Sequence, residues 1–279
     1  MITNQKLYTR LLQGLSRPAA AFELRQLFMH RTGWDPHTPL GGGDGISEED
    51  ACAVIALAAR LGDGEPLQYL LGQWEFYGLP FKVGPGVLIP RPDTETAVRV
   101  ALELLEGKEA PWMADFCAGS GAIGIAVTKN HPDVRCWSVE LSQGAVNYLH
   151  ANIMLNELEG RVVPVVGDVT VHLDLPPMDL IVSNPPYLTR QELAHVPREV
   201  AHEPAMALDG GEDGLRFYRA IAVQARPALV PGGALLFEVG HTQAASVADL
   251  MLEAGYRDVG TTEDYAGIPR CVWGFWEET

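Results

Sequence analysis

The stretch Trp112-Met-Ala-Asp-Phe-Cys-Ala-Gly-Ser-Gly-Ala-Ile-Gly-Ile-Ala126 decides the fold of this chain. Its first residues are mainly apolar and predict a buried strand, which runs into a glycine-rich turn. An apolar helix begins at Gly121, so backbone N–H groups at its N-terminus face whatever binds at the turn. This order predicts one unit of a parallel α/β sheet with a ligand site at the turn. A tight turn that only packs well is the structural alternative.

The glycines alone do not identify the ligand. From Gly119 onward they satisfy G-x-G-x-x-G, the fingerprint of dinucleotide sites, so a nicotinamide or flavin oxidoreductase is one interpretation. Asp115, at the end of the strand, can accept from an α-ammonium group, which S-adenosylmethionine has and a pyrophosphate lacks. Glu140 ends the next strand, nineteen residues after Gly121, where a carboxylate can bind both ribose hydroxyls. Asp115 therefore favours S-adenosylmethionine, whereas Glu140 supports adenosine binding without choosing between cofactors.

A second stretch, Asp179-Leu-Ile-Val-Ser-Asn-Pro-Pro-Tyr187, predicts a buried strand that two prolines stop abruptly. The prolines lock φ and make a rigid corner. Asn184 offers a side-chain carbonyl before the corner, and Tyr187 offers a flat apolar face after it. Rigid acceptors beside an aromatic plane suit a planar NH2 group whose hydrogens are held while its nitrogen reacts. An ordinary Pro-Pro turn with a capping Asn is the structural alternative.

These two stretches are expected to meet. In an open parallel sheet, ligands bind outside the carboxyl ends of the strands, near the point where the strand order switches. The glycine turn and the proline corner both follow carboxyl ends of predicted strands. We therefore expect them to converge on one crevice.

Helical spacing of apolar residues near the N-terminus predicts helices at 6–16, 19–31 and 48–61. Ser47 supplies an N-cap for the third helix, and acidic residues follow in its first turn. The Gly- and Pro-rich segment 33–45 is predicted to be a loop. We expect a small helical domain over residues 1–73. The residues themselves do not show whether it recognises a partner or only stabilises the chain.

Two short alternating runs around Gly78-Leu79-Pro80 predict a β-hairpin within a linker at 74–90. Two further prolines then stiffen an extended arm, and Thr94 is predicted to cap a helix that runs to Glu106. The hairpin strands are expected at 74–77 and 81–83.

From residue 91 to 279, strands and helices alternate, and two strands close the chain. This pattern predicts an αβα sandwich with a mainly parallel sheet and a closing antiparallel hairpin. The expected strands beyond the glycine turn are 134–139, 162–166, 180–183, 234–239, 256–262 and 271–276, and the expected helices are 143–157, one that ends at 229, and 243–254.

Composition narrows the function classes. The net charge of −16 would repel a phosphate backbone, so stable nucleic-acid binding is not expected. No apolar run approaches the ~18 residues that span a bilayer, and no membrane association is expected. Four widely spaced cysteines without a C-x-x-C pair argue against a metal site or a disulfide framework. We expect a reduced, cytoplasmic protein.

Several segments resemble a known family. Asn184-Pro-Pro-Tyr187 after an apolar strand resembles the signature of S-adenosylmethionine-dependent methyltransferases that act on exocyclic or amide nitrogen. The segment from Glu65 to Glu95, which ends in Ile-Pro-Arg-Pro-Asp-Thr-Glu, and the segment from Glu199 to Arg219 resemble the release-factor glutamine methyltransferases, the PrmC/HemK family. The resemblance implies a class I, Rossmann-like methyltransferase domain over 91–279 and an N-terminal substrate-recognition domain.

The resemblance also implies site residues. The arm from Arg91 to Glu95 should wall the active site, and the loop after the third strand should hold the adenine. His202 and Glu203 invite an acid–base interpretation, but a structural role in the loop is the expectation. The expected cofactor-binding residues are Asp115, Cys117, Ala118, Gly119, Ser120, Gly121, Glu140, Asp168, Val169 and Asn184. The expected substrate-binding residues are Asn184, Pro185, Pro186 and Tyr187, of which Asn184, Pro185 and Tyr187 are expected to be catalytic.

The glycine turn departs from the family pattern. Cys117 and Ala118 stand where Gly and Thr are usual, and Glu140 stands where Asp is more frequent. No ligand group is lost, so we expect adjusted loop packing and intact cofactor binding. Cys117 is expected to be a small packed residue rather than a reactive thiol.

The predicted function is methyl transfer from S-adenosylmethionine to the side-chain nitrogen of a protein glutamine. By resemblance, that glutamine belongs to the Gly-Gly-Gln motif of peptide-chain release factors. One alternative is a glutamine on a ribosomal protein, and another is an adenine or guanine in a nucleic acid. An oxidoreductase, or a methyltransferase-like binding module without turnover, would belong to a different class.

Overall fold

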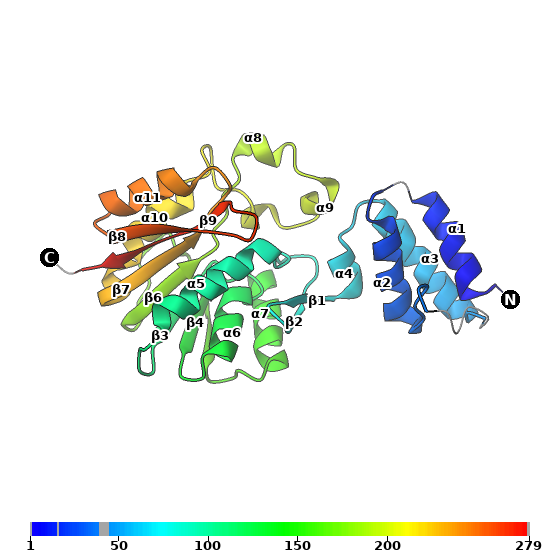
Figure 1. The fold of residues 1–279 in the computed structure, drawn as a ribbon, viewed down its shortest axis with the longest axis horizontal. Coiled ribbons are helices and arrows are strands. Elements are labelled where there is room, and N and C mark those ends of the chain that lie inside the picture. The colour runs from blue at the N-terminus through cyan, green and yellow to red at the C-terminus, as the bar shows by residue number, and fades with distance from the viewer. Residues whose placement is uncertain (1, 16, 39–44, 278–279) are drawn as a thin grey trace. The chain divides into compact units, whose positions relative to one another are not determined.

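A computed structural model describes residues 2–15, 17–38 and 45–277. The chain packs as two units, which are drawn in Figure 1. Unit 1 contains Met1–Gly72 together with Pro197–His202, and unit 2 contains Gln73–Val196 and Glu203–Thr279. The end of the first predicted helix at Ser16 and residues 39–44 of the predicted loop 33–45 lie outside the described residues.

Unit 1 is helical. Tyr8, Phe28 and Trp34 pack edge to face in this unit, and Leu24 and Leu27 are fully buried. The predicted cap of the third helix is present, because the Ser47 hydroxyl accepts from the Asp50 backbone N–H at 3.0 Å. The short fourth helix was not predicted. The helices are α1 (Asn4–Gly14), α2 (Ala20–Thr32), α3 (Glu48–Gly62), α4 (Leu67–Leu71) and α9 (Arg198–Ala201).

Unit 2 is built on a seven-stranded sheet in the order β5-β4-β3-β6-β7-β9-β8. The strands from β5 to β7 are parallel, whereas β9 runs antiparallel to both β7 and β8. This confirms the predicted α/β fold with its closing antiparallel hairpin. The strands are β3 (Trp112–Phe116), β4 (Arg135–Glu140), β5 (Val162–Val166), β6 (Met178–Ser183), β7 (Leu229–Glu238), β8 (Arg257–Glu263) and β9 (Pro269–Trp276).

Helices cover both faces of this sheet (Figure 1). Alternate residues of β6 serve the two layers: Leu180 and Val182 join the core under α5, α6 and α7, and Ile181 joins the core under α10 and α11. A buried parallel sheet needs this two-sided cover, and this explains the continuous apolar run in β6. The helices are α5 (Glu95–Leu105), α6 (Ala122–Asn130), α7 (Gln143–Leu155), α10 (Arg216–Gln224) and α11 (Ala244–Glu253).

The predicted hairpin exists, but its turn was placed wrongly. Strands β1 (Gln73–Phe76) and β2 (Leu79–Lys82) pair through Phe76 and Leu79, so the turn is only Tyr77-Gly78. Both turn residues have positive φ, +52° and +72°, which matches the twist of a two-residue hairpin. Pro80 therefore lies in β2, where a two-stranded ribbon tolerates it.

The predicted role of Thr94 as a helix cap was also wrong. Thr94 ends a short 3-10 helix, η1 (Pro92–Thr94), which continues directly into α5. Its backbone is already helical and its side chain makes no capping hydrogen bond to α5. The Thr94 hydroxyl instead accepts from the side chain of Asn184.

Two other predicted boundaries shifted in the C-terminal half. The helix expected to run to residue 229 ends earlier, as α10 followed by a 3-10 turn, η3 (Arg226–Ala228). Pro231-Gly-Gly lies inside β7 rather than before it, at an irregularity in the pairing with β6. The remaining short elements are α8 (Arg190–Leu193) and η2 (Ala205–Ala207). Among the described residues, no helix is long and apolar enough to cross a membrane.

Candidate active site

The glycine turn joins β3 to α6 under tight steric limits. The Gly124 N–H donates to Asp115 Oδ2 at 2.9 Å, which ties the first turn of α6 to the end of β3. A Cβ at Gly124 would lie 2.8 Å from Cys136 Sγ, and one at Gly121 would lie 2.5 Å from Leu149 Cδ1. Only glycine therefore lets the helix pack this closely on the sheet.

Asp115 is a buried carboxylate with one unused oxygen. Its side chain is 1% exposed, and Oδ1 has no hydrogen-bond partner among the described residues. Burial raises the pKa of Asp115 to about 7; the Gly124 N–H opposes the rise, and the nearby Glu140 adds to it. An unpaired buried carboxylate is costly, so this site favours a cation donor.

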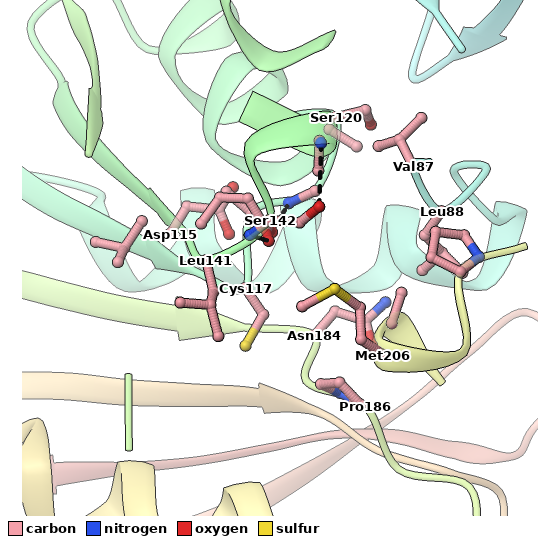
Figure 2. Close-up of a pocket in the computed structure, with 18 of the residues that line it drawn as sticks. Val87, Leu88, Asp115, Cys117, Ser120, Leu141, Ser142, Asn184, Pro186 and Met206 are labelled. Carbon is pink, nitrogen blue, oxygen red and sulfur yellow. Dashed lines mark hydrogen bonds between the residues drawn. The ribbon is translucent and has the colours of Figure 1, made fainter. Parts of the chain in front are cut away.

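Glu140, at the end of β4, is held by two backbone donors. The Gly119 N–H donates to Oε2 at 2.8 Å, and the Ser142 N–H donates to Oε1 at 2.7 Å. Dashed lines beside Ser142 in Figure 2 mark hydrogen bonds in this part of the site. These two bonds fix the orientation of the Glu140 carboxylate. Each of its oxygens can accept more than one hydrogen bond, so both can still accept from a ligand.

Cys117 has a left-handed backbone with φ +58°, a conformation that favours glycine. Glycine, which is usual at this position in the family, adopts this φ without strain. Burial raises the pKa of the Cys117 thiol, so it is not a thiolate at neutral pH. The four cysteines are free. Among the described residues, no group of three or more His, Cys, Asp or Glu side chains could hold a metal ion.

One cavity lies at the carboxyl ends of the central strands and has a volume of about 120 Å³. Ligands of open parallel α/β sheets bind in a crevice at this place. In Figure 2, Asp115 and Leu141 lie on one side of this space and Asn184 and Met206 on another. The predicted site residues that line it are Asp115, Cys117, Ala118, Gly119, Ser120, Glu140, Asp168, Val169, Asn184 and Pro186.

Three predicted residues do not line the cavity. Gly121 packs against Leu149 and Ile125, Pro185 is buried, and Tyr187 is half-buried. Burial raises the pKa of Tyr187 to about 12, so its hydroxyl stays neutral. Two side chains predicted for the adenine loop do reach the cavity: Val169 is buried, and Asp168 accepts from the Thr170 N–H and hydroxyl at 2.8 and 2.7 Å.

The corner at Asn184 is fixed from several directions. Asn184 Nδ2 donates to Thr94 Oγ1 at 3.3 Å, and Gln243 Nε2 donates to the Tyr187 carbonyl at 3.0 Å. A Cβ at Gly210 would lie 2.7 Å from Tyr187 Cα, and one at Gly214 would lie 2.4 Å from the Tyr187 carbonyl oxygen. These two glycines let the following loop pack directly on the corner.

The Ile-Pro-Arg-Pro-Asp-Thr-Glu arm is bound to different elements by successive residues. Both oxygens of buried Glu203 are used, one by the Ile89 N–H at 3.0 Å and the other by Arg91. Asp93 pairs with Arg270 of β9 at 3.1 Å. The sequence marked this arm as important but could not assign its contacts, because every partner is remote along the chain.

Several cavity residues were missed by sequence reasoning. They are apolar residues on loops, on η2 and on α10, and nothing in their local pattern separates them from ordinary surface or core positions. Examples that line the cavity are Val87, Leu88, Leu141, Met206 and Phe217.

The sheet order, the glycine turn and the cavity at the strand ends define a class I methyltransferase domain. Residues 81–263 match the family model of the methyltransferase small domain, and residues 5–72 match that of the PrmC N-terminal domain. The chain belongs to the release factor glutamine methyltransferase family.

Individual relatives agree with this assignment. A release factor glutamine methyltransferase of Burkholderia pseudomallei is 36% identical over 92% of both chains. One from Geobacter sulfurreducens is 42% identical over 82% of this chain and 80% of the relative. The crystal structure of a methyltransferase from Pyrococcus furiosus superposes with a TM-score of 0.55 at 15% identity, over 83% of this chain and all of that one, and it supports the fold alone.

Proposed function

We propose that this protein transfers a methyl group from S-adenosylmethionine to the side-chain nitrogen of a glutamine, and that this glutamine is the one in the Gly-Gly-Gln motif of peptide-chain release factors. The observation that carries the proposal is the placement of Asn184. Its side chain lines the same cavity as Asp115 and Glu140, and Thr94 holds its amide nitrogen. The names of the relatives support the choice of substrate.

The donor groups fit S-adenosylmethionine. Asp115 Oδ1 is a buried acceptor without a partner among the described residues, which suits the α-ammonium group. Glu140 is oriented by two backbone N–H groups and can accept from the ribose hydroxyls. Val169 offers an apolar surface and Asp168 an acceptor for the adenine. The bound cofactor would supply an electrophilic methyl group on a sulfonium.

The chain's own residues deal with the poor nucleophile. An amide nitrogen reacts weakly because its lone pair is delocalised into the carbonyl. Asn184 Oδ1 and the Pro185 carbonyl would each accept one hydrogen of the glutamine NH2 group, so the nitrogen is held in one orientation. As the new C–N bond forms, positive charge builds on nitrogen and meets two dipoles that already point at it. The methyl–sulfur bond of the cofactor would break as the C–N bond forms, with its electron pair left on sulfur. The nitrogen would then release one of its two protons to water, and the amide would be restored.

Supporting parts of the chain also receive roles in this proposal. Pro185 and Pro186 keep the corner rigid, and the Tyr187 ring provides a plane beside the substrate amide. Unit 1, which matches the PrmC N-terminal domain model, is proposed to recognise the release factor. The domain limits that we propose are 1–73 for recognition, 74–90 for the hairpin linker and 91–279 for methyl transfer.

Incubation with methyl-labelled cofactor and a peptide-chain release factor tests the proposal. The factor should become labelled, and a Gln→Ala change in its Gly-Gly-Gln motif should abolish the label. A ribosomal protein and an RNA, assayed side by side, serve as the competing substrates. Preferred labelling of either one, or unchanged labelling of the Gln→Ala factor, would refute the substrate assignment.

Asn184→Ala tests the site separately from the substrate. Turnover should fall by about two orders of magnitude or more, because a preorganised acceptor is lost. Cofactor affinity should change much less. Asn130→Ala is the matched control, because Asn130 only donates to Ala126 within α6. Equal losses in both variants would count against the proposed role.

A further inference from the structure

Glu238 is a buried carboxylate that the proposed chemistry does not yet use. It ends β7 and is 1% exposed, and its Oε2 has no hydrogen-bond partner among the described residues. Buried polar groups are usually paired, so a buried acid with a free oxygen calls for an explanation. Its surroundings connect it to the proline corner.

The sheet register places Glu238 next to Asn184. Ser183 of β6 pairs with Phe237 of β7, so the next residues along these parallel strands are Asn184 and Glu238. Strand neighbours in register project to the same face, here the face that carries α5. Thr94 immediately precedes α5, and Thr94 and Asn184 lie close enough to the Glu238 carboxyl to lower its pKa.

Donor and acceptor counting gives this cluster one consistent arrangement. Asn184 Nδ2 donates to Thr94 Oγ1, so the Thr94 hydroxyl hydrogen is free to donate to Glu238. An ionised carboxylate only accepts, and therefore it can face Nδ2 of Asn184 but not Oδ1. We propose that ionised Glu238 is a positioning residue that holds the Asn184 amide with Nδ2 toward the protein and Oδ1 toward the substrate.

Protonation would remove this selectivity. A neutral carboxyl can donate as well as accept, so it can also face Oδ1 after the Asn184 amide has rotated by half a turn. The rotated amide would present two hydrogens to the glutamine NH2 group, which then lacks an acceptor. The inference deepens the proposed function and rests on it, because it names what orients the acceptor.

Burial brings the titration of Glu238 into an accessible pH range. Burial raises the pKa of Glu238 to about 7; Thr94, Arg270 and Asn184 oppose the rise, and Asp93 adds to it. The ionised fraction therefore grows as pH rises through about 7. The titratable and charged groups that face Glu238 are Asp93, Arg270, Cys271, Tyr187 and Tyr218.

Glu238→Gln is the informative variant, because it keeps the shape and removes the acceptor-only character. We expect kcat to fall by about tenfold or more, with cofactor Kd within about twofold of the wild type. In the wild type, kcat should rise as pH increases through about 7. In Glu238→Gln, kcat should not show this rise. Asp179→Asn is the control, since Asp179 is a partly buried carboxyl of unit 2 that does not line the cavity.

A spectroscopic measurement keeps the inference separate from the substrate question. In ¹⁵N-labelled protein, the side-chain NH2 signals of Asn184 can be assigned by their loss in Asn184→Asp. They should titrate near pH 7 in the wild type and not in Glu238→Gln. Identical Asn184 signals in both proteins across that range, or an unchanged kcat in Glu238→Gln, would overturn the inference. A wild type that leaves release factors unlabelled would overturn the proposed function instead, while the Asn184 signals still decide the role of Glu238.

Discussion

Asn184 Nδ2 donates to Thr94 Oγ1 at 3.3 Å, although the two residues are 90 positions apart in the chain. The bond joins the proline corner after β6 to the arm that leads into α5. It gives Thr94 a role that its position before a helix did not suggest. The corner is therefore positioned by tertiary contacts as well as by its prolines.

Thr94→Val should lower kcat by about tenfold, because the side chain keeps its shape but no longer accepts from Asn184. Cofactor Kd should be nearly unchanged. Steady-state kinetics with release factor and calorimetric titration of the cofactor measure the two effects. Thr128→Val is the control, because the buried Thr128 hydroxyl has no partner among the described residues. A similar kcat loss in the control would contradict the assigned role.

Asp115→Asn should weaken cofactor binding by about tenfold to a hundredfold, because a charge-assisted hydrogen bond to the ammonium group is lost. In the wild type, affinity should also fall as pH drops below about 7, where the free carboxylate takes up a proton. Isothermal titration across pH measures both. Exposed Asp133→Asn is the control. A variant that binds as tightly as the wild type would remove Asp115 from the cofactor site.

The same carboxylate should make the cofactor-free protein less stable at higher pH. The folded pKa of about 7 lies above the ordinary 3.8, so the folded state binds more protons between these values, and stability falls as pH rises through them. This shift corresponds to a loss on the order of 4 kcal/mol. Urea unfolding at several pH values should show Asp115→Asn to be more stable than the wild type above pH 7. Parallel pH profiles for both proteins would contradict the assignment.

Gly210→Ala should destabilise unit 2 by about 1–3 kcal/mol, because overpacking forces the backbone to move. The new Cβ would lie 2.7 Å from Tyr187 Cα and 2.9 Å from Gly214 Cα. We also expect kcat to fall, since the corner must shift. Gly14→Ala is the control, because a Cβ there meets nothing within 4 Å. Chemical denaturation and kinetics on both variants test the packing argument.

Cys117→Gly should change stability by less than about 1 kcal/mol, because relief of the left-handed backbone is offset by the added freedom of glycine in the unfolded chain. Cofactor Kd should stay within about threefold, since Cys117 supplies no charged group. Cys117→Val should destabilise more, because a β-branched residue tolerates φ +58° poorly. Thermal unfolding and cofactor titration distinguish these outcomes; a large loss of affinity in Cys117→Gly would show that the thiol contributes directly.

The sequence pattern predicted the structure correctly wherever residues close together in the chain determine the conformation. The apolar runs of β3 and β6, the glycine turn after Phe116 and the Ser47 cap were all readable, because each depends on residues a few positions apart. The hairpin was recognised but its turn was misplaced. Proline in the sequence suggested a turn at Pro80, whereas positive φ at Tyr77 and Gly78 decided the register.

Contacts between distant segments decided the remainder. The sequence by itself determined that Asp115, Glu140 and Asn184 lie at or next to the carboxyl ends of strands, because strand length and breakers are local properties. Only the tertiary structure decided that Glu203 holds the arm, that Gly210 packs on Tyr187 and that Glu238 lies beside Asn184. The physical reason is that strand order and loop packing bring these residues together, and neither is encoded in the spacing of one segment.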